Sequence, residues 1–117
     1  MGIHDGVRPF ITKHLVNKLF TEAEKHGNAI PFTNTINSMR KIDGNKNFSV
    51  DRSKYVQIQT PQIFETKLIK ESLNRIQENN YTDEASLIEE IGLDVNLVEG
   101  EEENIKITTK KDLTYFN

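Results

Sequence analysis

Two residues near the start of the chain have side chains suited to binding a metal ion and a phosphate group. Asp5 and Arg8 stand three positions apart, directly after the short segment that ends at Ile3. A carboxylate at a strand end can hold a hard cation such as Mg²⁺, which prefers oxygen ligands, and a guanidinium can clamp a phosphate. Spacing alone favours a structural role, in which the carboxylate accepts hydrogen bonds from loop amides and the arginine is its ion partner. A single histidine beside a strand end, such as His4, is more often packed or hydrogen-bonded than catalytic.

Lys106 is a second kind of candidate, because it is flanked by two isoleucines in a predicted strand over 105–107. A lysine that points out of an apolar strand end can neutralise a phosphate group. A lysine that protects an edge strand from aggregation explains the pattern equally well.

Arg52, Thr60 and Thr82 complete the set of candidates that the residues themselves suggest. Arg52 lies at the foot of a predicted hairpin. It either pairs with Asp51 or, if the hairpin crosses a two-fold interface, reaches an anionic ligand bound mainly by another copy. Thr60 and Thr82 supply hydroxyls and helix-terminal amides suited to phosphate oxygens, although each alone is typical of a turn or a cap. Ligands of open α/β sheets bind at the carboxyl ends of strands, which is where these candidates gather.

Length and composition limit the classes of protein to consider. The 117 residues, with 15 Lys and Arg against 18 Asp and Glu, can bury one core, so we expect a single domain over 1–117. The absence of cysteine excludes a disulfide framework, a thiolate metal site and a catalytic thiol, and makes the cytoplasm the default location. No apolar run approaches the ~18 residues that span a bilayer. The net charge of −3 gives no broad attraction to nucleic acid.

Apolar spacing predicts the elements that must position these residues. Between Thr12, an N-cap, and Gly27, a terminator, apolar residues recur at three- and four-residue intervals and predict a helix. Further helices are predicted over 64–76, between a cap at 82 or 83 and Gly92, and from a capping box at 109–112. Strands are predicted over 28–32, 55–59, 95–98 and 105–107, with Pro31 placing the first near an edge or a strand end. This alternation predicts an α/β layered fold with a mostly parallel sheet.

The pattern of apolar residues changes over residues 33–52 and predicts a projecting β-arm. An Asp-Gly turn signal at 43–44 marks a hairpin. Its apolar residues are too sparse for a core face, so we expect the arm to lean on a second copy of the protein. Only residues 1–3 precede the polar pair at 4–5, fewer than the about five or six residues of a typical strand, so we also expect the first strand to be truncated.

Five segments in order carry a resemblance to a known family. They are 4–10 (His-Asp-Gly-Val-Arg-Pro-Phe), 50–53 (Val-Asp-Arg-Ser), 59–62 (Gln-Thr-Pro-Gln), 82–86 (Thr-Asp-Glu-Ala-Ser), and 97–100 (Leu-Val-Glu-Gly) with 104–108 (Asn-Ile-Lys-Ile-Thr). Together they resemble the C-terminal half of 2-C-methyl-D-erythritol 4-phosphate cytidylyltransferase, over nearly the whole chain.

The resemblance implies a fold, a reaction and a set of site residues. The fold is a Rossmann-like nucleotidyltransferase fold, N-terminally truncated, and the reaction transfers CMP from CTP to 2-C-methyl-D-erythritol 4-phosphate in non-mevalonate isoprenoid biosynthesis, releasing pyrophosphate, with Mg²⁺ or another divalent cation. The implied partner is a second copy, whose arm supplies two of the site residues. The implied roles are catalytic for Asp5, Arg52 and Lys106, metal-binding for Asp5, and substrate-binding for Arg8, Thr35, Thr60 and Thr82, with Thr35 and Arg52 coming from the partner's arm.

One departure from the family and two alternatives remain. The six glycines, at 2, 6, 27, 44, 92 and 100, are scattered, so the family's glycine-rich CTP loop is absent from this sequence, and we expect the chain alone not to turn over CTP. Ribitol-5-phosphate cytidylyltransferases share the Asp-x-x-Arg-Pro pattern. A non-catalytic dimerisation or ligand-binding module is the alternative from another class.

Overall fold

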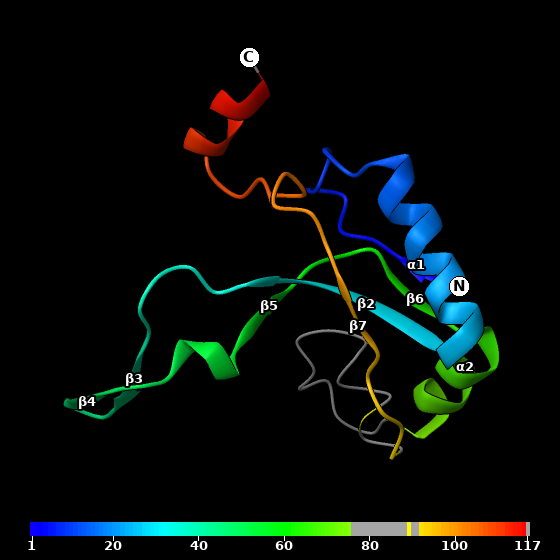
Figure 1. The fold of residues 1–117 in the computed structure, drawn as a ribbon, viewed down its shortest axis with the longest axis horizontal. Helices are drawn as coiled ribbons and strands as arrows, with labels where there is room; N and C mark the ends of the chain where they lie inside the picture. The colour runs from blue at the N-terminus through cyan, green and yellow to red at the C-terminus, as the bar shows by residue number, and fades with distance from the viewer. Residues whose placement is uncertain (76–88, 90–91, 117) are drawn as a thin grey trace.

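The computed structural model describes residues 1–75, 89 and 92–116 of the chain. Two helices pack beside one sheet, and a hairpin projects from it (Figure 1). The elements in chain order are β1 (Gly2–Ile3), α1 (Lys13–His26), β2 (Asn28–Asn34), β3 (Arg40–Asp43), β4 (Lys46–Ser49), the 3₁₀ helix η1 (Arg52–Lys54), β5 (Val56–Ile58), β6 (Gln62–Phe64), α2 (Thr66–Arg75), β7 (Leu97–Glu99) and the 3₁₀ helix η2 (Lys111–Phe116).

Helix α1 confirms the predicted caps. Thr12 accepts a hydrogen bond from the Leu15 amide at 3.1 Å, and Gly27 adopts the left-handed conformation (φ 86°) that favours glycine at a helix end. Leu15 and Leu19, four positions apart, are buried on one face of the helix. They pack in one core cluster with Ala29 of β2 and with Ile63 and Val98, so α1 covers one face of the sheet.

Strand β2 is the centre of the sheet, and the expectation of a mostly parallel sheet is wrong for the described strands. β2 pairs antiparallel with β5 and β6 on one side and parallel with β7 on the other, and β1 pairs antiparallel with β6. The reason is the connection between β2 and β5: the chain leaves along β2, forms the arm and returns beside β2, as in a long hairpin. β5 and β6 then form one bent segment that runs antiparallel to β2.

Pro31 is buried within this central strand, which corrects the prediction that it lies at an edge or a strand end. On the β7 side the ladder uses Ile30 and Phe32, whose partners are Asn96 and Gly100. Position 31 therefore faces the other side, where its carbonyl accepts a hydrogen bond from the Gln59 amide at 2.9 Å. This is the bend between β5 and β6, so the missing N–H of proline falls where the ladder is already interrupted.

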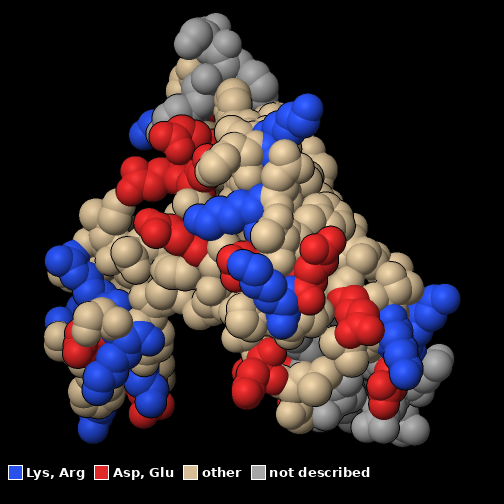
Figure 2. Space-filling view, turned by 45° about the vertical axis from the view of Figure 1, so that its right-hand side comes forward, with Lys and Arg blue, Asp and Glu red and all other residues tan. Residues whose placement is uncertain are grey.

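The predicted hairpin is present as β3 and β4, which form a separate two-stranded sheet. Gly44, in the turn between the strands, has a φ of 60°, a conformation that glycine adopts without steric cost. Every residue of both strands is exposed. The arm extends away from the body (Figure 1), and Lys and Arg predominate on it in the lobe at the lower left of Figure 2.

The remaining segments differ from the predictions in three places. Residues 62–64 form the buried strand β6, so α2 begins at Thr66 rather than at 64. Residues 105–107 form no strand. The capping box at 109–112 is present, since the Thr109 amide donates to Asp112 Oδ2 at 3.1 Å, but it opens a 3₁₀ helix. The helix predicted between 82 or 83 and Gly92 lies largely outside the described residues. Within the described ranges, neither helix has the length and apolar character needed to span a bilayer.

Candidate functional site

The loop that follows β1 is folded around the side chain of Thr60. The Asp5 amide donates to Thr60 Oγ1 at 2.9 Å, and His4 Nδ1 lies 2.9 Å from the same oxygen. Thr60 belongs to the bend between β5 and β6 and is 7% exposed. Its hydroxyl thus joins two chain segments that are distant in the sequence, and it fixes the direction in which Asp5 leaves the sheet.

His4 closes the same loop from its other end. His4 Nε2 lies 3.0 Å from the Arg8 carbonyl oxygen, which can only accept, so Nε2 carries the proton. In the neutral ring Nδ1 is then an acceptor, and the Thr60 hydroxyl donates to it while accepting from the Asp5 amide. His4 is hydrogen-bonded, as its position beside a strand end predicts.

Asp5, Arg8 and Lys106 are brought together, as predicted. Arg8 Nε donates to Asp5 Oδ2 at 3.2 Å, and Lys106 Nζ lies 4.0 Å from the same oxygen. The Arg8 side chain is only 12% exposed, and its Nη1 donates to the Asn104 carbonyl at 2.9 Å. Lys106 is 51% exposed. Arg8 therefore acts mainly as an internal connector, whereas Lys106 offers the accessible positive charge.

A cleft of about 420 Å³ lies beside this cluster. Its charged lining residues are Arg8, Lys106 and Glu102, and the exposed residues Asn37 and Gln57 are among its uncharged polar ones. Asp5 does not line the cleft itself, but its Oδ2 is shared by the two lining cations. The arrangement suits a hydroxylated anion, because cations meet the negative charge and amide groups meet hydroxyls.

Gln59 and Asn104 belong to the site, although sequence reasoning did not single them out. Both are buried, and Asn104 Nδ2 lies 3.4 Å from Gln59 Oε1. Gln59 Nε2 donates to the Glu101 carbonyl at 2.8 Å. Gly100 allows this close approach, since a Cβ there would stand 2.5 Å from Gln59 Oε1. Both residues lie within the segments that carry the family resemblance, which is the signal in the sequence that could have found them.

Thr35 and Arg52 hold the base of the arm rather than reaching the Asp5 cluster of their own chain. Thr35 Oγ1 donates to the Tyr55 carbonyl at 3.3 Å, and Arg52 Nη1 donates to the Ile36 carbonyl. The Asp51 carboxylate is hydrogen-bonded by Ser53 rather than by Arg52, which was its alternative expected partner. Ser53 donates from its hydroxyl and its amide to Asp51 Oδ1, and these hydrogen bonds lower the pKa of Asp51. Thr82 lies outside the described residues.

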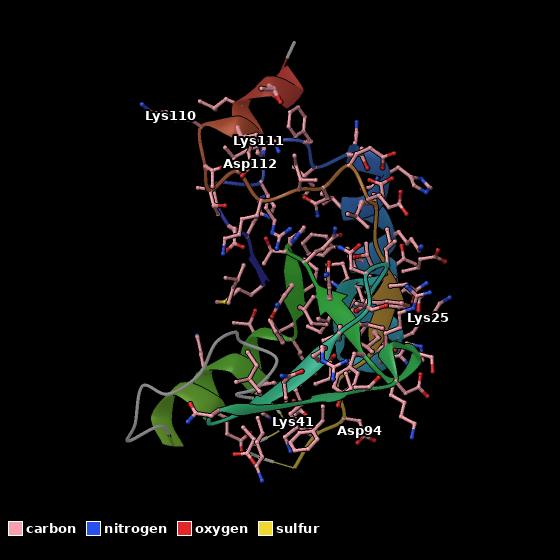
Figure 3. All side chains as sticks on the ribbon, turned by 90° about the vertical axis from the view of Figure 1, so that its left-hand side faces the viewer. Lys25, Lys41, Asp94, Lys110, Lys111 and Asp112 are labelled. Carbon is pink, nitrogen blue, oxygen red and sulfur yellow. The ribbon has the colours of Figure 1, made fainter. Side chains whose placement is uncertain are left out.

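Figure 3 shows charged side chains at other parts of the chain. Lys110, Lys111 and Asp112 gather at the C-terminal 3₁₀ helix, far from Lys41 on the arm. Asp112 accepts the Thr108 and Thr109 amides, and these hydrogen bonds lower its pKa. The Asp112 carboxylate therefore serves a local turn.

The comparisons with known proteins agree on one family. The family model described as 2-C-methyl-D-erythritol 4-phosphate cytidylyltransferase matches residues 1–117. Proteins of that name from Bacteroides thetaiotaomicron and Geobacillus kaustophilus are each 40% identical, over 113 and 116 residues; the match covers 97% of this chain in both cases and 52% and 51% of those proteins. The chain thus spans about half the length of the curated relatives it matches.

Solved structures give the same result for the fold. The crystal structure of 2-C-methyl-D-erythritol 4-phosphate cytidylyltransferase from Thermus thermophilus has a TM-score of 0.88 at 32% identity, covering 97% of this chain and 58% of that one. The crystal structure of 4-diphosphocytidyl-2C-methyl-D-erythritol synthase from Anaerococcus prevotii has a TM-score of 0.86 at 35% identity, covering 96% and 52%. These likenesses confirm the predicted Rossmann-like nucleotidyltransferase fold class.

Proposed function

Because the chain belongs to the family of 2-C-methyl-D-erythritol 4-phosphate cytidylyltransferases, we propose that its cleft forms the sugar-phosphate side of a cytidylyltransferase site. The observation that carries this proposal is the convergence of Asp5, Arg8 and Lys106 beside one cleft. The family's enzymes are nucleotidyltransferases. The proposed substrates are CTP and 2-C-methyl-D-erythritol 4-phosphate, in non-mevalonate isoprenoid biosynthesis.

The proposed reaction joins two anions, which explains why cations are needed. An oxygen of the sugar phosphate attacks the α-phosphorus of CTP, the bond from that phosphorus to the pyrophosphate oxygen breaks, and pyrophosphate leaves with the electron pair. Positive groups that offset the repulsion between the phosphates stabilise the transition state. Lys106 supplies such a charge on the cleft, and Arg8 holds the Asp5 carboxylate beside it.

A divalent cation is part of this proposal, and Asp5 is the described residue that fits one. Its side chain is 38% exposed, and both neighbouring cations contact the same oxygen, Oδ2. Within the part of the chain that the structure describes, no three or more acidic, histidine or cysteine side chains gather to enclose a metal. Mg²⁺ is commonly held by one or two carboxylates, with water and phosphate oxygens completing its shell. When bound, the ion offsets phosphate charge, and the chain's part is to orient Asp5 through Arg8 and Thr60.

The proposed assembly is a homodimer formed through the β-arm. The arm's strands pair only with each other among the described strands, and Ile42 at the arm is 79% exposed. The arm is also basic, with Arg40, Lys41, Lys46 and Arg52 against Asp43 and Asp51. In this assembly Thr35 and Arg52 would approach the cleft of the other copy. A cytoplasmic location is also proposed, because the proposed substrates are phosphorylated metabolites.

Calorimetric titration with 2-C-methyl-D-erythritol 4-phosphate tests the proposal. The chain is expected to bind the sugar phosphate without turning over CTP, since these 117 residues contain no glycine-rich phosphate loop. Lys106→Ala is expected to weaken binding about tenfold or more, the size of one lost charge-assisted contact. Lys110→Ala, which removes a lysine at the C-terminal 3₁₀ turn, is the matched control and should bind like the wild type.

Two results would contradict this reading. Wild-type protein that binds no sugar phosphate at millimolar concentrations removes the proposed role of the cleft. Tighter binding of ribitol 5-phosphate than of 2-C-methyl-D-erythritol 4-phosphate would keep the reaction class and change the sugar.

A further inference from the structure

Asn104 is the most buried polar residue in the described part of the chain, with 0% of its surface exposed. We infer that Asn104 is a positioning residue, which holds Lys106 beside Asp5 by fixing the chain two positions before the lysine onto the bend between β5 and β6. The inference deepens the proposed function and rests on it for the role of Lys106 in binding phosphate.

The side chain of Asn104 makes the first half of this attachment. Its Nδ2 donates to the Thr60 carbonyl at 2.7 Å and lies 3.4 Å from Gln59 Oε1. Both acceptors belong to the bend between β5 and β6. The Thr60 hydroxyl also accepts a hydrogen bond from the Asp5 amide. The asparagine is therefore attached to the same point that orients the carboxylate.

The backbone of Asn104 makes the second half. Its carbonyl accepts from Arg8 Nη1 at 2.9 Å and lies 3.3 Å from Gln59 Nε2, and its amide donates to the Glu101 carbonyl at 3.1 Å. Arg8 carries the other end of the connection, because its Nε donates to Asp5 Oδ2. One residue thus contacts the loop after β1, the bend and the turn after β7.

Lys106 depends on such attachments because its segment has no strand pairing. Residues 104–108 are irregular. On the far side of the lysine, the Ile107 amide donates to the Val7 carbonyl at 2.7 Å. Asn104 and Ile107 therefore bracket Lys106, and they set the 4.0 Å separation between its Nζ and Asp5 Oδ2.

The attachment acts through the donors of the Asn104 amide. Asn104 Oδ1 is a buried atom with no hydrogen-bond partner among the described groups, and leaving a buried acceptor unpaired is unfavourable. The favourable contacts come from Nδ2, which faces two oxygens. Asn104→Ala removes these contacts, whereas Asn104→Asp places a carboxylate against the Thr60 carbonyl and should be the more damaging change.

Asn28 provides a matched control elsewhere in the fold. It is also a buried asparagine, 3% exposed, and its side chain joins two segments through the Asp94 carbonyl at 3.0 Å and the Asn96 amide at 2.8 Å. Asn28→Ala should therefore lower thermal stability by a similar amount and leave the Asp5 cluster unchanged.

Cross-linking measures the position of Lys106 without any ligand. A carbodiimide joins a carboxylate to an amine that lies beside it, and mass spectrometry of the purified chain reports the Asp5–Lys106 product. Asn104→Ala is expected to reduce this product several-fold, and Asn28→Ala to leave it at the wild-type level. An unchanged yield in Asn104→Ala, or equal losses in both variants, overturns the inference. If Asn104→Ala fails to fold, Asn104→Ser, which keeps one donor, is tested at a temperature where it is folded, with the same expectation of a reduced yield.

A double-mutant cycle connects this position to binding. With 2-C-methyl-D-erythritol 4-phosphate as the probe, Asn104→Ala should weaken binding about tenfold in the wild-type background and have no further effect when Lys106→Ala is already present. Additive losses would show that Asn104 acts independently of Lys106 and would overturn the inference. If the wild-type chain binds no sugar phosphate, the proposed function fails, while the cross-linking yield still decides the positioning role.

Discussion

The hydroxyl of Thr60 lies 2.9 Å from the Asp5 amide and 2.9 Å from His4 Nδ1, so one side chain of the bend between β5 and β6 fastens the loop that carries the site carboxylate. Both partners sit within a loop that is otherwise short of regular pairing, because β1 ends at Ile3. The geometry of the loop is therefore set by a tertiary contact rather than by the strand that precedes it.

Thr60→Val tests this fastening, because valine keeps the shape and removes the hydroxyl. The Asp5 amide then loses its acceptor in a partly buried place, and we expect the free energy of unfolding to fall by about 1–3 kcal/mol. Denaturant unfolding measures the change. Thr60→Ser retains the hydroxyl and should stay close to the wild type; equal stability of the valine and serine variants would contradict the assignment.

Gly100→Ala tests the close approach of the turn after β7 to the bend. A Cβ at this position would stand 2.5 Å from Gln59 Oε1 and 3.1 Å from the Phe32 carbonyl oxygen. We expect a loss of stability of about 1–3 kcal/mol from this overpacking, read as a lower midpoint in thermal unfolding. Gly6→Ala is the control, since nothing lies within 4 Å of a Cβ there, and a comparable loss in that variant would remove the steric explanation.

We expect the stability of the turn that opens the C-terminal 3₁₀ helix to depend on pH through the Asp112 carboxylate. The Thr108 and Thr109 amides lower the pKa of Asp112 in the folded chain. Because the folded pKa lies below the ordinary unfolded value of 3.8, the ionised carboxylate stabilises this turn at pH values above 3.8. This contribution is lost as the pH falls through the folded pKa. Amide chemical shifts of both threonines should report this titration at acidic pH, and Asp112→Asn should abolish it. Shifts that move only near neutral pH would contradict the assignment.

A substitution in the arm tests whether copies of the chain associate through it. Ile42→Asp places a charge at a residue that is 79% exposed, so the fold of the isolated chain should be unchanged. If the arm forms the proposed dimer, light scattering behind size-exclusion chromatography should show the wild type as a dimer and the variant shifted toward the monomer. A wild-type chain that is monomeric at all concentrations would contradict the proposed assembly. The circular dichroism spectrum of the variant provides the control for folding.

Sequence patterns predicted the parts of the fold that local interactions determine. Thr12 and Gly27 bound α1 as expected, because cap geometry depends on a few neighbouring residues. The hairpin at β3 and β4 follows from its turn in the same way. The convergence of Asp5 with Lys106 followed from the family resemblance and the placement of candidates at the ends of predicted strands.

The rest depends on contacts between distant segments, which short-range patterns do not record. The bend at 59–61 joins β5 to β6, and both strands run antiparallel to β2 because the arm returns the chain beside it. Nothing in the apolar spacing marked 62–64 as a separate strand. Ile105 and Ile107 are typical of a strand, but no neighbouring strand pairs with them in the described structure. Asn104 was not singled out because its importance comes from its burial against Gln59 and Thr60.

The arm shares no strand pairing with the body within the described residues, and its base is fastened by contacts such as those from Thr35 to Tyr55 and from Arg52 to Ile36. Substitutions toward its tip can therefore accumulate over evolutionary time without disturbing the sheet that carries Asp5. If the arm forms the proposed dimer and the cleft the proposed anion site, selection can adjust contacts at the tip of the arm separately from the residues around Asp5.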